Sequence, residues 1–298
     1  MRSFIDIVKF IWSHPLSSQN RVKAFRRFFA WQTGQQIMNF PVLYPFVEDS
    51  VLLIEKGMAG ATGNIYTGLL EFEDMAFILH VLRNGDVFCD VGANVGAYTI
   101  LASKNAGARV LSIEPVPVTF RKLAHNVAVN DVNDLVTLLP FGAADESGTL
   151  RFTQNMDAIN HVASEGENSG NQITIEIPVR SLDELTAEHQ PVIMKMDVEG
   201  FEWPALQGSR KLLAPSSKLK GLVIELNGSG KRYGFSEKEI HRLLLSNGFN
   251  PYRYHPFTRN LERLDEPGNL NTIYLRDIEW ILERIRTARK YLVLGREI

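Results

Sequence analysis

The stretch that decides the fold is DVFCDVGANVGAYTILASKNAGARVLSIE, residues 86–114. It opens with an apolar run at 87–91, which is typical of a strand buried on both faces of a parallel sheet. Gly92 and Gly96 bracket the turn that follows, and glycine there permits positive φ and lets a ligand approach the bare backbone. A helix then leads into a second apolar strand at 109–113. The stretch therefore predicts a strand–turn–helix–strand unit of the kind that binds nucleoside cofactors.

The residues around the turn narrow the choice of cofactor. Glu114 ends the second strand about 20 residues after the turn, where an acid suits a pair of ribose hydroxyls. The turn lacks the middle glycine of the dinucleotide fingerprint, because Asn94 stands there. Asp90 would repel a pyrophosphate but suits the ammonium and sulfonium of S-adenosylmethionine (SAM). We therefore expect SAM rather than NAD, and the alternative is a glycine loop that only connects the strand to the helix.

Composition sets the broad class of the protein. The chain has 298 residues, of which 45% are hydrophobic and 22% charged, as in an ordinary globular protein. Its formal net charge of -2 gives no global basic field for a nucleic acid. The single cysteine, Cys89, excludes an intrachain disulfide and is expected to pack in the first core strand. No apolar run approaches ~18 residues, so we expect no transmembrane span and a cytoplasmic location.

The first 45 residues read as a helical extension. Residues 1–31 contain six Lys/Arg and one Asp, arranged in two aromatic-rich helical segments around His14-Pro15. They lack the long apolar region and cleavage site of a signal peptide. We expect a cap packed on the domain or on a second copy in a homodimer. The alternative is peripheral contact with a membrane surface.

The rest of the chain alternates strands and helices. Core strands are expected at 135–139, 192–196 and 222–226, with a closing hairpin of 249–254 and 271–275 and a C-terminal helix at 277–292. This order predicts an α/β fold with a doubly wound, mostly parallel sheet and an antiparallel edge. The domain boundaries are 1–45 for the extension, 46–275 for the catalytic domain and 276–298 for the C-terminal helix.

Two segments outside the sheet are expected to border the site. The glycine-rich residues 57–68 precede the cofactor strand and could line it as a loop. The strands at 149–153 and 173–179 alternate with period two, and the polar segment 154–172 between them is a candidate lid. His161 lies in that segment, where a solvated loop histidine is the leading interpretation.

An acid in the turn after the third strand is a candidate adenine contact. Residues 141–145 read FGAAD, and Asp145 could accept from the exocyclic amine of adenine. The alternative is an ordinary turn aspartate beside 146–148.

The segment KMDVEGFEW, residues 195–203, carries the candidate chemistry. Ligands bind at the carboxyl ends of strands in open α/β sheets, and acids there cost desolvation unless they have a partner or a task. Asp197 and Glu199 would share a face in extended backbone, and Lys195 would hold their charge. The alternative is a structural ion cluster. We assign no metal ligand, but magnesium or manganese on Asp197, Glu199 and Glu225 remains a second possibility.

These motifs together resemble the FkbM family of SAM-dependent methyltransferases, over roughly residues 70–275. The likeness is carried by DVGANVGAYT at 90–99, Glu114-Pro115, AADESG at 143–148, SLDEL at 181–185 and KMDVEGFEW at 195–203. It implies a class I methyltransferase fold: a Rossmann-like, seven-stranded, mostly parallel sheet with helices on both faces.

The resemblance also implies a reaction, O-methylation of a sugar, glycan or related natural product. It places Asp90, Gly92, Asn94, Gly96 and Glu114 in the cofactor cradle and makes Asp197 and Glu199 the signature acids. The hypothesis is in-line transfer, with Asp197 as base or hydroxyl orienter and with Glu199 and Lys195 holding it. The alternatives are a SAM-binding protein without chemistry and an NAD-dependent oxidoreductase.

Overall fold

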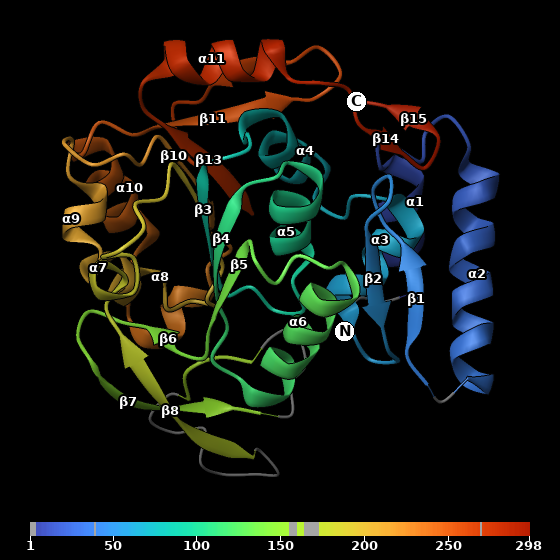
Figure 1. Ribbon diagram of the computed structural model, residues 1–298, viewed down its shortest axis with the longest axis horizontal. Helices are drawn as coiled ribbons and strands as arrows, with labels where there is room; N and C mark the ends of the chain where they lie inside the picture. Colours follow the sequence, from blue (N-terminus) through green and yellow to red (C-terminus); the bar gives the residue numbers. More distant parts are fainter. Residues whose placement is uncertain (1–3, 39, 155–159, 164–172, 269) are drawn as a thin grey trace.

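The computed structural model describes residues 4–38, 40–154, 160–163, 173–268 and 270–298 (Figure 1). Its centre is an eight-stranded sheet with the spatial order β12-β11-β13-β10-β9-β3-β4-β5. The strands are β3 (Val87–Val91), β4 (Arg109–Ile113), β5 (Val136–Leu139), β9 (Ile193–Met196), β10 (Gly221–Glu225), β11 (Asn250–His255), β12 (Asn260–Arg263) and β13 (Asn271–Leu275). The five strands from β10 to β5 are parallel, and β13, β11 and β12 are antiparallel.

Seven of these strands form the predicted sheet. Numbered along the chain without β12, their spatial order is 3-2-1-4-5-7-6, so the last strand, β13, lies between β10 and β11. The predicted α/β class and the antiparallel hairpin of β11 with β13 are confirmed. The predicted number of strands is one too low, because 260–263 pairs with β11 at the sheet edge. This four-residue strand is polar and exposed, so it shows no apolar alternation in the sequence.

Helices cover both faces of the sheet, as in a doubly wound fold (Figure 1). The elements on one side are α4 (Phe72–Val81), α5 (Ala97–Ile100) with its π-helical continuation (Leu101–Asn105), and α6 (Pro117–Val129). On the other side are α7 (Leu182–Leu185), α8 (Glu202–Gln207), α9 (Arg210–Leu213) and α10 (Glu237–Ser246). Each face has its own apolar core, with Phe88 in one and Met196 in the other. Because these five strands are parallel, their carboxyl ends all lie at the same end of the sheet.

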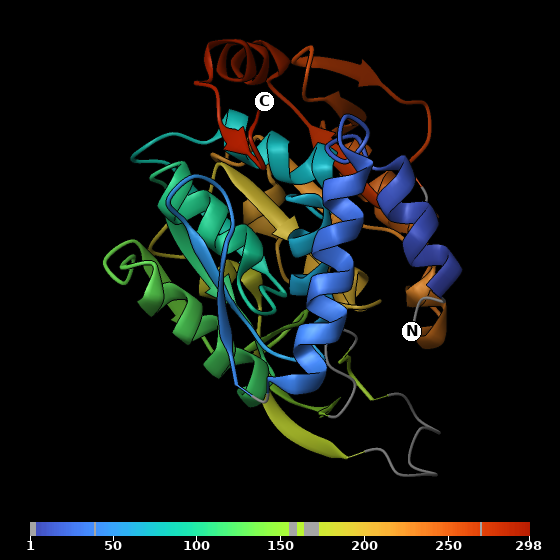
Figure 2. The same ribbon diagram turned by 90° about the vertical axis from the view of Figure 1, so that its right-hand side faces the viewer.

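The N-terminal residues pack onto this domain. They form α1 (Phe4–Ser13), α2 (Arg21–Ile37), the hairpin of β1 (Val42–Pro45) with β2 (Val51–Ile54), and α3 (Ala59–Thr67). α1 and α2 lie side by side (Figure 2). The Arg27 guanidinium of α2 donates to the carbonyls of Ile65 and Tyr66 at the end of α3, and Trp31 is buried in the same core as α4. The extension is thus a cap on the domain.

The glycine-rich segment of the N-terminal half is a helix and not a loop. The glycine-rich residues 57–68 were expected to be a loop beside the cofactor, but 59–67 form α3, which packs against α2. Gly63 of this helix leaves room for the Leu70 side chain. Among the described helices, none is long and apolar enough to cross a bilayer.

A small three-stranded sheet lies beyond the carboxyl end of β5. It consists of β6 (Gly142–Ala143), β7 (Gly148–Thr153) and β8 (Thr174–Arg180). The predicted alternation is confirmed, since Ile177 and Val179 are buried between exposed neighbours. The candidate lid, 154–172, is described only at 154 and 160–163, and the remainder lies outside the described residues.

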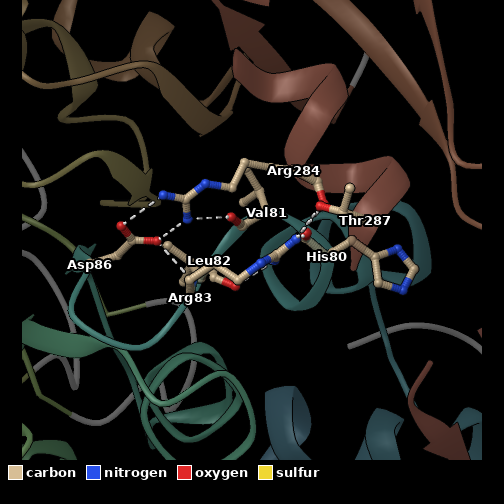
Figure 3. A network of polar contacts seen from close by, with 7 residues as sticks. All are labelled: His80, Val81, Leu82, Arg83, Asp86, Arg284 and Thr287. Carbon is tan, nitrogen blue, oxygen red and sulfur yellow. Dashed lines mark hydrogen bonds and ion pairs between the residues drawn. The ribbon is translucent and has the colours of Figure 1, made fainter. Parts of the chain in front are cut away.

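The C-terminal helix α11 (Ile278–Thr287) is joined to the start of β3 by a network of polar contacts (Figure 3). The Arg284 guanidinium pairs with the Asp86 carboxylate and donates to the Val81 carbonyl at 3.3 Å. Arg83 donates from its guanidinium to the Arg284 carbonyl and to Thr287 Oγ1, and its backbone N–H donates to Asp86 at 2.8 Å. The network connects α11 to the amino-terminal end of β3, a central strand of the sheet.

We expect Arg284→Met to lower the free energy of unfolding by roughly 2–3 kcal/mol, because it leaves the Asp86 carboxylate mostly buried without its cation. Urea unfolding followed by circular dichroism measures this. Arg286→Met, at an exposed position on the same helix, is the control and should change stability by less than about 0.5 kcal/mol. Equal losses in the two variants would show that the network does not anchor α11.

Candidate active site

A hollow opens at the carboxyl ends of β3, β4 and β9, where the strand order reverses direction on either side of β3. Open α/β sheets bind their ligands at such a switch point. Five of the predicted site residues line the hollow: Gly92, Asn94, Glu114, Asp197 and Glu199. The others, Asp90, Gly96, Lys195 and Asp145, lie behind it or away from it.

The glycine turn is held tightly against the ends of β4 and β9. The N–H groups of Gly92 and Ala93 both donate to the Ile113 carbonyl at 3.0 Å. Gly92 has φ +74°, and a Cβ there would lie 1.8 Å from the Asp197 carbonyl oxygen. A side chain at this position is therefore excluded by the backbone of the acidic segment. The close approach seen at Gly92 is that of the protein's own backbone, and the approach of a ligand to this glycine stays a prediction.

Glu114 closes the turn from the β4 side. One carboxylate oxygen accepts from the Asn94 N–H at 3.0 Å and the other from the Val116 N–H at 2.9 Å. Burial raises the pKa of Glu114 to about 8, against the opposing effect of these two hydrogen bonds. Each carboxylate oxygen has a second lone pair. The side chain can therefore brace the turn and also accept from a ligand's hydroxyl groups.

Asp90 lies behind the hollow rather than in it. Its carboxylate is buried in β3 and accepts from Thr99 Oγ1 at 2.6 Å, while Oδ1 has no hydrogen-bond partner among the described groups. Burial raises the pKa of Asp90, and the Lys195 ammonium opposes this rise. Asp90 therefore lies behind the hollow, and its role toward the cofactor stays a prediction. Gly96, with φ +93°, begins α5, and its missing side chain makes room for Leu123.

Asp145 does not reach the hollow. Its side chain is exposed in the turn between β6 and β7, so the structure gives no support to an adenine contact. The apolar wall is made instead by Phe141, Phe152, Val162 and Phe201. Phe152 lies on β7 and Val162 in the 160–163 segment, and neither residue belongs to a quoted motif. The prediction of a lid at 154–172 covers Val162 but not Phe152.

The acidic segment is organised around a buried lysine. Lys195 is 4% exposed; its Nζ lies 2.9 Å from Asp197 Oδ2 and 5.3 Å from the centre of the Tyr98 ring. Burial would raise the pKa of Asp197, but the charge and hydrogen bond of Lys195, together with hydrogen bonds from Glu225 and the Glu199 backbone, lower it overall. Burial would likewise lower the pKa of Lys195, yet Asp197 and Asp90 raise it. The predicted pairing of Lys195 with Asp197 is present.

Glu199 meets Asp197 for a different reason from the predicted one. The backbone is not extended here, because Glu199 has φ +55° and Gly200 has φ +101°. This turn is fixed by Glu202, whose carboxylate accepts from the N–H groups of Val198 at 3.2 Å and Gly200 at 3.1 Å. Glu202 was not among the predicted site residues. An acid in the first turn of α8 could have indicated this capping role.

A third carboxylate joins from the next strand. Glu225 ends β10, and one oxygen each of Asp197, Glu199 and Glu225 lie within 4.8 Å of one another. Burial and then repulsion from Asp197 raise the pKa of both Glu199, to about 7, and Glu225. The trio can hold a hydroxyl group and accept its proton. Its carboxylate oxygens are also ligands that magnesium or manganese accepts.

A family model confirms the resemblance drawn from the sequence. The methyltransferase FkbM domain model matches residues 90–251, more than half of the chain. The chain belongs to the FkbM methyltransferase family.

Individual relatives of this FkbM methyltransferase are remote. It is 28% identical over 180 residues to hexuronic acid methyltransferase AglP of Haloferax volcanii, which covers 58% of the chain and 67% of AglP. It is 25% identical over 169 residues to methyltransferase sdnD of Sordaria araneosa, covering 46% of the chain and 65% of sdnD. Over 90 residues it is 37% identical to 31-O-demethyl-FK506 methyltransferase FkbM of Streptomyces tacrolimicus, covering 29% of the chain and 34% of that protein. The chain thus spans between about a third and two thirds of these relatives.

Among solved structures, M. jannaschii TYW2 in complex with AdoMet aligns with a TM-score of 0.42 and 11% identity. The alignment covers 80% of this chain and 88% of TYW2. The assignment rests on the family match and on the strand order of the sheet rather than on so distant a structure.

The residues of the hollow fit the cofactor of this family, SAM. Glu114 offers acceptors for ribose hydroxyls, and the side chains of Phe141, Phe152 and Phe201 suit a flat adenine ring. The role of Asp90 toward the sulfonium stays a prediction. The hollow measures about 60 Å³, below the ~300–1,000 Å³ of small-molecule sites. The lining must therefore open to admit a whole cofactor.

Proposed function

We propose that this FkbM methyltransferase transfers the methyl group of SAM to a hydroxyl oxygen of a sugar, glycan or related natural product. The observation that carries the proposal is the convergence of Asp197, Glu199 and Glu225 beside the hollow formed by the glycine turn and Glu114. AglP, a relative, is named for methylating a hexuronic acid, which supports a sugar-type acceptor.

The cofactor brings an activated methyl group on a sulfonium, and the protein supplies alignment and a place for the proton. Alignment of the acceptor oxygen with the methyl group can contribute ~7–11 kcal/mol. Asp197 has a lowered pKa, which suits it to accept a hydrogen bond from the hydroxyl and orient it. Glu199, with a pKa of about 7, is matched to receive the proton at neutral pH. Lys195 holds Asp197 in place from behind.

Cofactor binding tests the role of Glu114. Its pKa near 8 leaves it mostly protonated at pH 7, whereas a carboxylate accepts better from ribose hydroxyls and attracts the cationic cofactor. Binding should therefore release a proton, and calorimetric SAM affinity should rise about tenfold or more from pH 6 to pH 9. In Glu114→Gln the affinity should be lower and this dependence should flatten. Glu146→Gln, at an exposed acid, is the control. An unchanged pH dependence in Glu114→Gln would contradict the assignment.

The same titration separates the alternative functions. NAD binding in place of SAM, with hydride transfer, would support an oxidoreductase. SAM binding without S-adenosylhomocysteine formation across a broad pool of hydroxylated acceptors would support a binding protein without chemistry.

We propose that the exposed side chains of α1 and α2 bind a partner. Ile5, Trp12, Val22 and Phe29 are each more than half exposed, and Arg21 and Lys23 lie among them. Basic, aromatic helices of this kind suit an anionic membrane surface, and a homodimer would bury the same side chains.

A further inference from the structure

A second, larger cavity adjoins the acid trio of Asp197, Glu199 and Glu225 and shares none of the residues that line the hollow. Its volume is about 490 Å³, within the ~300–1,000 Å³ range of small-molecule sites. Three parts of the chain enclose it: Phe10 and 14–15 of the N-terminal extension, residues 70–74 at the start of α4, and the β11–β13 edge of the sheet. The extension therefore forms one wall of a cavity in the catalytic domain.

Glu225 places this cavity next to the chemistry. It lines the cavity, whereas Asp197 and Glu199 line the first hollow, and the three carboxylates lie within 4.8 Å of one another. A second link runs through Tyr98, whose ring lies beneath the Lys195 ammonium and whose hydroxyl donates to Glu71 of the cavity at 2.7 Å. The acid trio thus stands between the two spaces, where a methyl donor on one side and an acceptor on the other would meet.

The lining has a definite chemistry. Four acids line the cavity, Glu71, Glu73, Asp74 and Glu225, and Arg253 is the one arginine or lysine among the described lining residues. Burial raises the pKa of Asp74 to about 8 and that of Glu225 to about 9, so these two are mostly protonated at neutral pH, and the negative charge of the lining comes from the other two acids. His14 also lines it, but burial lowers its pKa to about 4, and its Nε2 lies 2.8 Å from the Leu69 carbonyl oxygen.

Aromatic rings complete the cavity wall. Phe10, Phe72 and Tyr252 supply apolar faces, against which the C–H face of a sugar ring can pack. Carboxyl groups hydrogen-bond to hydroxyls whether they are charged or protonated.

We propose that this cavity is the acceptor site and that it takes a hydroxyl-rich ring that is neutral or bears an amine, and not one that bears a carboxylate. The proposal rests on the methyltransferase function proposed above and names its substrate class. A carboxylate in the cavity would meet Glu71 and Glu73 with only Arg253 to pair with, and Arg253 already lies 3.9 Å from Glu73. The acceptor class therefore differs from the hexuronic acid in AglP's name.

Ligand-observed NMR on the full chain saturated with S-adenosylhomocysteine tests this with three methyl glycosides that share one ring: glucose, glucosamine and glucuronic acid. The neutral and amino glycosides should bind at least about tenfold more tightly than the glucuronide. Equal or tighter binding of the glucuronide, or no binding of any glycoside, would overturn the proposal. Calorimetric titration with SAM tests the proposed function separately. A protein that does not bind SAM would contradict that function, whatever the glycosides do.

Two variants locate the binding in the cavity. Glu73→Lys reverses one charge at the cavity rim and should bring the glucuronide affinity several-fold closer to that of the amino glycoside. Glu279→Lys makes the same change in the first turn of α11, away from the cavity, and should change neither the glucuronide affinity nor the amino glycoside affinity. Phe10→Ala should weaken all glycosides several-fold with SAM affinity unchanged. Unchanged glycoside binding in both Glu73→Lys and Phe10→Ala would show that the acceptor binds elsewhere.

Discussion

Replacing Asp197 with asparagine is expected to lower kcat by about 10²–10⁴-fold while SAM still binds. The amide keeps the size of the side chain but removes the charge that pairs with Lys195 and the carboxylate that would orient the acceptor hydroxyl. Methyl transfer from radiolabelled SAM gives kcat, and calorimetry gives cofactor affinity. A fall in kcat with SAM affinity within a few-fold of the wild type would assign Asp197 to the chemical step.

Asp145→Asn is the matched control for this change, because it makes the same substitution at an exposed aspartate outside the hollow. Its activity should equal that of the wild type. Near-full activity of Asp197→Asn would refute the assigned role. Activity of the wild type that disappears with a chelator and returns with magnesium would instead make the trio of Asp197, Glu199 and Glu225 a metal site.

The second large effect is expected at Gly92. An alanine Cβ there would lie 1.8 Å from the Asp197 carbonyl oxygen, and the backbone would keep an unfavourable φ of +74°. Backbone cannot yield as a flexible side chain does, so we expect Gly92→Ala to cost roughly 3–5 kcal/mol of unfolding free energy or to prevent folding. Any folded protein should have lost SAM binding, because Gly92 and Asp197 line the same hollow.

Gly85→Ala is the control that separates the clash with the Asp197 carbonyl oxygen from the strain of a positive φ. Gly85 precedes the same strand and has φ +87°, but nothing lies within 4 Å of the position that a Cβ would take. It should lose only the cost of the left-handed backbone, about 1–2 kcal/mol. Equal destabilisation of the two variants in urea unfolding would mean that the contact between the turn and the acidic segment does not constrain the fold.

The features that could be predicted from the sequence are those that a single short segment determines. The glycine turn and Glu114 were found because a backbone that must adopt positive φ and an acid at a strand end are local requirements. The pairing of Lys195 with Asp197 was found for the same reason, since the two residues lie two positions apart in the chain. The apolar runs located the buried strands, because a strand covered on both faces has no polar positions.

The missing parts depend on contacts between distant segments. Phe152 reaches the hollow from a separate small sheet, and Glu225, which the sequence indicated only as a possible metal ligand, joins Asp197 across neighbouring strands. The second cavity combines Phe10 with residues more than 50 positions away, which no periodicity reveals. Glu199 shows a further limit: its approach to Asp197 depends on a positive φ, which sequence spacing alone did not predict.

The position of β13 bears on how the chain folds as it leaves the ribosome. β10 needs a partner on its outer edge, and that partner, residues 271–275, is synthesised after β11, which lies one place further out. Until residue 275 has emerged, the nascent sheet ends at β10 with unpaired backbone groups, which invite pairing with another chain. β11 can join the sheet only together with β13 or after it, so the central sheet is completed only once residue 275 has left the ribosome.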